Sequence, residues 1–306
     1  MKKVASEYKA FLESANMFIA ARKQSGIEIT PELARVGINA FKQFSLPNVD
    51  VKNILDSNIN YSDRNVPVRI YDPAPDQTKP IIIFIHGGGH MCGNIDAYDP
   101  IGRRLADTSK HLVITIDYSL SPEFRYPQGL NDCQAMLDQL DTLIQNFKVD
   151  MHSISLAGDS AGGALATTLA LNNEAINFSK LILIYPSLDY TFSTSSYETF
   201  SSGYLLETER VSWYFDNYFE SNADRKNASP LFSSKLSRLP ETLILAAELD
   251  PLVDEGKLFH DNLISANVKT DYHEGKGLIH CYLNLEVLNP TIIEHTYQTI
   301  AEFLNK

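Results

Sequence analysis

The amino-acid sequence predicts a doubly wound α/β fold, in which helices cover both faces of a mostly parallel sheet. Three observations support this prediction. Short runs of β-branched and other apolar residues recur along the chain. Each run is apolar at successive positions, as in strands that are buried on both faces of a parallel sheet. Helical segments of ten or more residues separate several of the runs, and this alternation is typical of doubly wound α/β proteins.

Size and charge limit the classes of function. The chain has 306 residues, of which 44% are hydrophobic and 21% are charged, and this is ordinary for a globular protein with a large core. The formal net charge of -12 argues against nucleic acid as a partner, because phosphate backbones are bound by patches of Lys and Arg.

The location of the protein is predicted from its apolar segments and cysteines. No run approaches the roughly 18 apolar residues of a membrane span, and the first residues lack the apolar segment of a signal peptide. The three cysteines have no metal-like spacing. We therefore expect a cytoplasmic protein with reduced thiols, without stable insertion in a membrane.

Two amphipathic helices are predicted at the N-terminus. Apolar residues recur at helical spacing over residues 4–22, and a second apolar stripe follows Thr30 and Pro31. Thr is a favourable N-cap, and Pro suits the first turn of a helix. We expect both stripes to pack on the core, because a helix on a membrane surface would need a more basic polar face.

The strands of the sheet are predicted from residue 50 onward. Residues 66–71 form the first strand-like segment, and a Pro-rich turn follows it. Five buried strands are then predicted: IIIFI (81–85), LVITI (112–116), ISLA (154–157), LILIY (181–185) and LILAA (243–247).

Residues 190–225 interrupt the alternation of strands and helices. This segment is rich in aromatic residues, contains Trp213, which is the only Trp of the chain, and is predicted to include an inserted helix. Ligand sites in open α/β sheets lie at the carboxyl ends of the strands. An insertion at that edge is therefore expected to cover a site.

A serine lies where a predicted strand meets a predicted helix. Ser160 is flanked by Gly158 and Gly162 in GDSAGG (158–163). The pattern Gly-x-Ser-x-Gly at such a junction is typical of a nucleophile elbow, because the tight turn needs small neighbours and exposes the serine oxygen. The turn also directs the N-terminus of the helix toward that oxygen. The alternative is a serine that caps the helix, with glycines for packing.

A second motif follows another buried strand directly. His86 precedes three consecutive glycines, Gly87 to Gly89. Such a run lets backbone N–H groups turn toward one point, and this is how an oxyanion hole is formed. A flexible turn or a phosphate-binding loop would be the alternative, but the Lys-Ser/Thr of the P-loop pattern does not follow, and the dinucleotide-binding pattern is absent. The motif alone does not distinguish among the three glycines.

The base that would activate Ser160 is expected to be a histidine. In α/β enzymes with this elbow, the order along the chain is serine, acid and histidine. Only His260, His273 and His280 follow Ser160. His260 lies in a helical stretch and His273 ends a strand-like run. We favour His280, because it follows the predicted loop GKGLI (275–279), from which it could reach the elbow.

Four carboxylates are candidates for the acid that orients the histidine. They lie in AAELDPLVDEG: Glu248, Asp250, Asp254 and Glu255. Pro251 suits the first turn of a helix, which places Asp250 near the N-cap in the loop after the strand. Asp254 and Glu255 would then complement the helix dipole. Glu248 is expected to point away or to support the site, so we favour Asp250.

These motifs together resemble the hormone-sensitive-lipase-like esterases, which are bacterial family IV carboxylesterases of the α/β-hydrolase fold. HGGGH (86–90) and GDSAGG (158–163) are both complete. The similarity continues in DYSLSPEFRYP (117–127), LIYPSLD (183–189), SPLFSSKLSRLPETLILAAELDPLVDEG (229–256) and HCY (280–282). It covers nearly the whole chain after residue 50.

The resemblance implies a serine carboxylesterase that hydrolyses short- to medium-chain acyl esters, without a metal ion or organic cofactor. Ser160, Asp250 and His280 would form its catalytic triad. The N–H of Ala161 would contribute to the oxyanion hole, and the resemblance favours the N–H groups of Gly88 and Gly89 for the rest. A small-molecule ester is the expected partner, and the resemblance is compatible with a homodimer.

Other positions are expected to support the site rather than to act in it. The resemblance assigns such a supporting place to four residues: His86, Gly87, Glu123 and Asp159. It also divides the chain into an N-terminal helical cap (1–48), an α/β-hydrolase core (49–189 and 226–306) and a cap insertion (190–225).

Three residues depart from the family's usual pattern. Ser119 and Val253 stand where members often carry Arg, and Cys281 stands where Gly commonly follows the histidine. These departures concern local salt bridges and the shape of the site. Two alternative functions remain: an amidase or formamidase with the same triad, and a non-enzymatic receptor for a small molecule. A receptor would be expected to lose a member of the triad.

Overall fold

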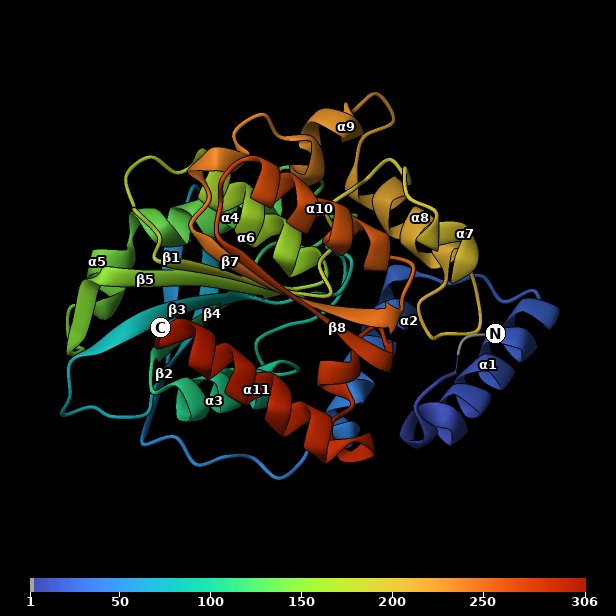
Figure 1. The fold of residues 1–306 in the computed structure, drawn as a ribbon, viewed down its shortest axis with the longest axis horizontal. Helices are drawn as coiled ribbons and strands as arrows, with labels where there is room; N and C mark the ends of the chain where they lie inside the picture. Colours follow the sequence, from blue (N-terminus) through green and yellow to red (C-terminus); the bar gives the residue numbers. More distant parts are fainter. Residues whose placement is uncertain (1–2) are drawn as a thin grey trace.

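The computed structural model describes residues 3–306, and its centre is one eight-stranded sheet (Figure 1). The strand order is β1-β2-β4-β3-β5-β6-β7-β8. The strands are β1 (Asn53–Tyr61), β2 (Arg64–Asp72), β3 (Lys79–Ile85), β4 (Leu112–Ile116), β5 (Val149–Asp159), β6 (Lys180–Ile184), β7 (Glu241–Leu249) and β8 (Thr270–Ile279). β1, β2 and β4 pair antiparallel, and all other pairs are parallel. The predicted fold class is confirmed.

Helices cover both faces of this sheet. In Figure 1, α4, α6 and α10 lie on one face, and α3 and α11 lie on the other. The helices are α1 (Lys9–Gln24), α2 (Pro31–Asn39), α3 (Asp99–Ser109), α4 (Gln128–Asp138), α5 (Leu140–Ile144), α6 (Ala161–Asn172), α7 (Ser196–Thr199), α8 (Thr208–Tyr218), α9 (Arg225–Ala228), α10 (Val253–Ser265) and α11 (Pro290–Leu304). No helix within residues 3–306 is long and apolar enough to cross a membrane.

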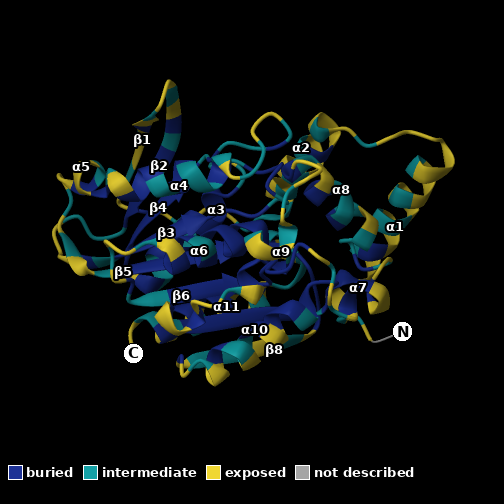
Figure 2. Cartoon of the chain, turned by 90° about the horizontal axis from the view of Figure 1, so that it is seen from above, coloured by how far each residue is buried: buried dark blue, intermediate teal, exposed yellow. Residues whose placement is uncertain are grey.

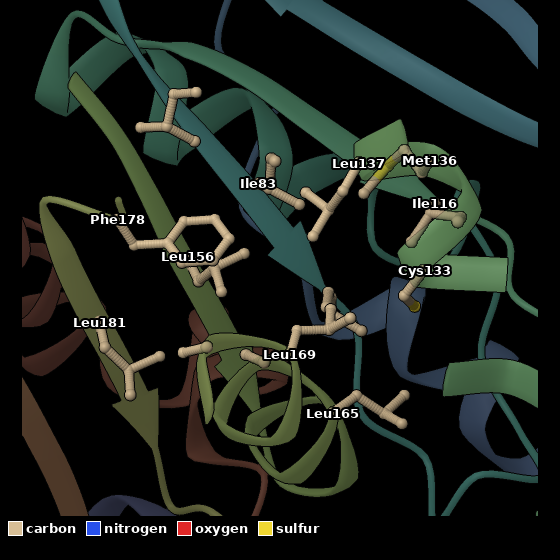
Figure 3. Packing of buried hydrophobic residues seen from close by; sticks show 14 of the residues in the cluster. Ile83, Ile116, Cys133, Met136, Leu137, Leu156, Leu165, Leu169, Phe178 and Leu181 are labelled. Carbon is tan, nitrogen blue, oxygen red and sulfur yellow. The ribbon is translucent and has the colours of Figure 1, made fainter. Parts of the chain in front are cut away.

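Successive residues of each central strand pack into different cores. In β3, Ile81 and Ile83 belong to a cluster with Leu165 of α6, part of which Figure 3 shows. Ile82 and Phe84 belong to the cluster on the opposite face. Because both faces are covered, these strands are apolar at every position, and this explains why the runs predicted from the sequence are strands in the structure.

Three differences from the predicted elements have local causes. The first predicted helix is a 3-10 turn (Ser6–Tyr8) followed by α1. β1 was missed, because it is an edge strand with mostly solvent-facing residues and no continuous apolar run. The prediction of a loop at 275–279 was wrong: these residues continue β8, which pairs with β7 at Gly275 and again at Ile279, on either side of an irregularity in the register.

The helix start at Thr30 is confirmed. The side-chain oxygen of Thr30 accepts a hydrogen bond from the backbone N–H of Leu33 at 3.3 Å, and Pro31 begins α2. α1, α2, α7 and α8 lie together beyond the carboxyl ends of the parallel strands (Figure 1). We call this group the cover, and it includes the 3-10 turn Ala40–Phe44 after α2 and the segment that joins α7 to α8. In Figure 2, α1 carries many exposed residues, whereas the central strands are buried.

Candidate active site

The junction between β5 and α6 places a serine at the carboxyl edge of the sheet. Ser160 has φ 49° and ψ -120°, backbone angles that occur in a sharp turn. Its N–H donates to the carbonyl of Ile184 at 2.9 Å. A Cβ atom at Gly158 would collide with the backbone of Gly162, and one at Gly162 would collide with the backbone of Ile85. The two glycines therefore let β5, α6 and the end of β3 approach closely.

Three side chains from three strand ends meet at this edge. The Nε2 atom of His280 lies 2.9 Å from the Oγ atom of Ser160. The Nδ1 atom of the same ring lies 2.6 Å from Oδ2 of Asp250. His280 directly follows β8, and Asp250 directly follows β7. The structure thus brings together the serine, histidine and acid that the sequence analysis selected.

The histidine and its acid are buried. His280 is 3% exposed and Asp250 is 0% exposed. Burial by itself lowers the pKa of His280, but the adjacent Asp250 carboxylate outweighs burial, so the pKa lies well above its ordinary value. An imidazolium at this position is therefore stabilised by the carboxylate at its Nδ1 side.

The glycine loop after β3 lies beside Ser160. Gly88 has φ 110° and Gly89 has φ 64°, values that favour glycine. A Cβ atom at Gly88 would collide with the backbone of Cys92, and one at Gly89 would collide with the ring of Tyr214. No described residue accepts a hydrogen bond from the N–H of Gly88 or Gly89. These donors are thus free to bind an oxygen in the pocket.

Two residues fix the start of this loop. The N–H of Gly87 donates to Oδ1 of Asp159 at 2.7 Å, and Asp159 is completely buried. Burial raises the pKa of Asp159 to about 7. Nδ1 of His86 lies 2.7 Å from the carbonyl of Gly87, and the His86 ring stacks on Tyr118 with centroids 4.4 Å apart. His86 and Asp159 therefore hold Gly87, the first residue of the loop, in place, and neither has a hydrogen bond to the hydroxyl of Ser160 among the described residues.

Glu123 lies farther from the site than the resemblance implied. Its carboxylate is half exposed and forms two hydrogen bonds with Arg35 of α2, at 2.9 and 2.5 Å. Arg35 also donates to the carbonyls of Met91 and Ser121. Glu123 has no hydrogen bond to the serine, the histidine or the glycine loop within residues 3–306, so it holds the cover rather than the reacting groups.

The other three acids of the β7–α10 segment face away from His280. Glu248 accepts from the N–H of Gly277 in β8 at 2.8 Å. Asp254 accepts from the N–H of Ser196 in α7 at 2.8 Å. Asp254 therefore joins α10 to α7, in addition to the expected interaction of its charge with the helix dipole.

Glu255 likewise joins α10 to the cover rather than serving the dipole alone. Its side chain is completely buried and accepts hydrogen bonds from the N–H groups of Leu188 and Asp189 and from the hydroxyl of Tyr197. Burial raises the pKa of Glu255 to about 8. Pro251 also differs from the prediction: it lies in a turn before α10, which begins at Val253, and Asp250 is in that turn.

A narrow pocket opens onto the serine. It contains about 60 Å³ that the centre of a water-sized molecule can reach. The sheet side of its lining comprises Gly88, Gly89, Tyr98, Ser160, Ala161, Ser187, Leu252, His280, Cys281 and Asn284, and the cover side comprises Ile38, Phe41, Leu206, Val211, Tyr214 and Phe215. Gly88, Gly89, Ala161 and Ser160 thus border the same space.

Sequence reasoning did not identify several of these lining residues. Ser187 lies within the motif LIYPSLD (183–189), and Asn284 follows His280 by four positions, so both lie in or near motifs that were recognised. Tyr214 had only the general aromatic character of its segment as a signal. Within residues 3–306, no three His, Cys, Asp or Glu side chains are grouped so that they could hold a metal ion.

The departures from the family pattern are accommodated locally. The buried Asp132 forms an ion pair with Arg64 of β2, with 2.5 Å between Nη2 and Oδ1, and the hydroxyl of Ser119 is hydrogen-bonded to the same guanidinium. Val253 is buried at the start of α10. Cys281 has φ 61° and lines the pocket next to His280.

Comparisons with known proteins identify relatives of this chain. A family model described as the alpha/beta hydrolase fold matches residues 82–284. An acetyl esterase of Salmonella schwarzengrund is 33% identical over 248 residues, covering 78% of this chain and 76% of the relative. An ethyl acetate hydrolase of Pseudomonas putida is 31% identical over 229 residues, covering 72% of each chain.

A solved structure gives the same result. The ester hydrolase EH1AB1 from the metagenome of Lake Arreo superposes with a TM-score of 0.89 at 27% identity, covering 98% of both chains. The chain therefore belongs to the hormone-sensitive-lipase-like carboxylesterases of the α/β-hydrolase fold, and it is a serine ester hydrolase.

Proposed function

We propose that this enzyme hydrolyses short-chain carboxylic esters by acyl transfer to Ser160. His280 removes the hydroxyl proton of Ser160 through Nε2, and the serine oxygen attacks the ester carbonyl. Asp250 holds the imidazole with Nδ1–H toward its carboxylate and stabilises the imidazolium that forms. His280 then protonates the leaving alcohol. Water, deprotonated by His280, releases the acyl group from Ser160.

The oxyanion of each tetrahedral intermediate is assigned to backbone donors. The N–H groups of Gly88 and Gly89 have no partner among the described residues. The N–H of Ala161 lies at the N-terminus of α6, where the helix dipole favours negative charge. Donors that are already oriented stabilise the transition state more than the substrate, and one such donor contributes about 10²- to 10³-fold to kcat.

The small pocket supports the preference for short acyl groups. Apolar side chains of the cover close the space above Ser160, and Tyr214 lies directly over Gly89. A pocket of fixed size limits the acyl chain by volume, because each additional methylene must displace well-packed side chains. Acetyl and other short acyl groups fit this limit. Two relatives are named for activity on short acyl esters, an acetyl esterase and an ethyl acetate hydrolase, and they support the same preference.

The observation that carries this proposal is the pair of hydrogen-bond contacts made by His280. Its Nε2 atom lies 2.9 Å from Oγ of Ser160, and its Nδ1 atom lies 2.6 Å from Oδ2 of Asp250. The test is kcat/KM on 4-nitrophenyl esters with acyl chains from two to sixteen carbons, with 4-nitroacetanilide as the amide control. We expect the highest kcat/KM at short chains and little amide cleavage. Rates that rise steadily to sixteen carbons would contradict the short-chain preference.

A further inference from the structure

The two sides of the pocket differ in polarity. The cover side is apolar apart from the hydroxyl of Tyr214, whereas Ser187, Cys281 and Asn284 lie on the sheet side near Ser160 and His280. None of the lining residues that the structure describes is Asp, Glu, Lys or Arg. Such a pocket suits a ligand that is apolar at one end, polar at the other and without charge, because an unpaired charge would lose its hydration.

Asn284 lines this space and carries a side-chain amide. Its Oδ1 atom accepts from the hydroxyl of Tyr185 at 3.4 Å, which orients the amide group. No described residue accepts from its Nδ2 atom, and Asn284 is half-buried in the turn after His280. An amide nitrogen carries two donors, so this one can bind an oxygen of a ligand.

Ser187 is a second unsatisfied polar group on the same side. Its side chain is 4% exposed, and its hydroxyl has no hydrogen-bond partner among the described residues. The N–H of Ser187 donates to the carbonyl of Ser160 at 3.0 Å, so the residue is held beside the proposed nucleophile. A buried hydroxyl without a partner is unfavourable, and a ligand oxygen would relieve this cost.

We propose that Asn284 and Ser187 select esters that carry an uncharged oxygen substituent, such as a hydroxyl group, close to the ester bond. This inference rests on the proposed function, because it concerns the substrate of the same site. The hydroxyl group could belong to the acyl part or to the alcohol part of the ester. The two residues are specificity-determining: they bind the substituent and take no part in bond breaking.

The test uses two pairs of esters in which a hydroxyl group replaces a methyl group. The acyl pair is methyl 2-hydroxypropanoate and methyl 2-methylpropanoate, and the alcohol pair is 2-hydroxyethyl acetate and propyl acetate. For each pair, the ratio of kcat/KM (hydroxyl over methyl) is measured for wild type, Asn284→Leu and Ser187→Ala. Leu206→Ala is the control, because it changes the apolar side of the pocket without changing its polarity.

We expect the wild-type ratio to exceed one in at least one pair, and that pair identifies which part of the ester carries the group. Asn284→Leu should lower this ratio about three- to tenfold, as for one hydrogen bond to a neutral group, and Ser187→Ala should lower it about threefold. Leu206→Ala should change both members of a pair alike.

Ratios at or below one in both pairs, or ratios that neither variant changes, would overturn this inference. In that case, hydrolysis of methyl 2-methylpropanoate and propyl acetate would still support the proposed ester hydrolysis. Failure of wild type to hydrolyse any of the four esters would instead contradict the proposed function.

Discussion

The carboxyl edge of the sheet and the cover above it are held in place by different contacts. At the edge, Asp250 and His280 are buried, and backbone hydrogen bonds tie Ser160 to Ile184 at the end of β6 and to Ser187 after it. In the cover, Met17 and Phe18 of α1 are each 72% exposed. α1 is connected to the start of α8 by ion pairs between Lys23 and the acids Glu207 and Glu209.

This difference indicates that the carboxyl edge determines the rate of the chemical step, whereas the cover determines which esters are accepted. Groups that must keep sub-ångström geometry are placed on rigid strand ends, where packing and backbone hydrogen bonds restrict them. The cover contributes apolar pocket side chains, and exposed ion pairs such as those of Lys23 contribute only about 0–1 kcal/mol each. We therefore expect variants at the edge to lower kcat strongly, and variants in the cover to change mainly which esters are accepted.

The largest effect is expected for Ser160→Ala. Removing the nucleophile should lower kcat by about 10⁴-fold or more, because the members of a triad act as a unit. The far-UV circular dichroism spectrum and thermal midpoint should stay close to wild type, since only one oxygen is lost. Near-normal turnover in a folded variant would exclude Ser160 as the nucleophile.

Asp250→Asn should have an effect of similar order. The amide cannot hold the imidazole in the same tautomer, so kcat should fall by about 10⁴-fold. Steady-state kinetics on an acetyl ester measure this. The matched control is Asp254→Asn, four residues later on α10, and a larger loss of kcat there would show that the wrong acid was selected.

The pH profile should report the environment of His280. The adjacent Asp250 carboxylate outweighs burial and keeps the pKa of His280 well above its ordinary value of 6.5. His280 must be neutral to accept a proton, so kcat/KM should fall tenfold per pH unit below that pKa. The acidic limb should thus lie above pH 6.5 in the wild-type enzyme. An acidic limb at or below that pH would contradict this.

Tyr214→Ala tests the cover. Its ring lies over Gly89 and lines the pocket, so its removal should enlarge the space available to the acyl group. The ratio of kcat/KM for an octanoyl ester to that for an acetyl ester should rise about tenfold, the scale of discrimination for one or a few methylenes.

Trp213→Ala is the matched control on the same helix. Trp213 lines an outer groove with Arg22 and Ile27 rather than the pocket at Ser160. Its removal should leave the ratio of octanoyl to acetyl ester unchanged. An equal change in both variants would mean that general loosening of the cover, rather than Tyr214, sets the acyl-chain length.

The smallest effect is expected for Asp254→Asn. Its carboxylate accepts hydrogen bonds from the N–H and the hydroxyl of neighbouring serines, Ser196 and Ser195, at 2.8 Å each. Loss of the charge should lower the free energy of unfolding by about 1 kcal/mol, with kcat nearly unchanged. Urea denaturation of the variant and wild type measures the difference, and an unchanged midpoint would show that these contacts do not stabilise the fold.

The sequence by itself determined the sheet class and the groups proposed for the chemistry. Buried parallel strands are continuous apolar runs, so five of them were predictable from the local sequence alone. The Gly-x-Ser-x-Gly and HGGG patterns were informative because their backbone geometry excludes larger residues, as Gly158 and Gly88 show. His280, which the sequence favoured, lies beside Ser160, although the expected loop before it is the end of β8.

Only the tertiary structure decided which distant side chains meet. β1 and the end of β8 are edge segments with weak apolar patterns, so local sequence could not assign them. Arg64 compensates Asp132 from another element, and Arg35 of α2 pairs with Glu123, which sequence similarity had placed beside the site. Such contacts depend on how the elements pack. The local sequence around each residue contains no pattern that reveals which distant residue it will contact. The pocket that joins Tyr214, Ser187 and Asn284 forms for the same reason.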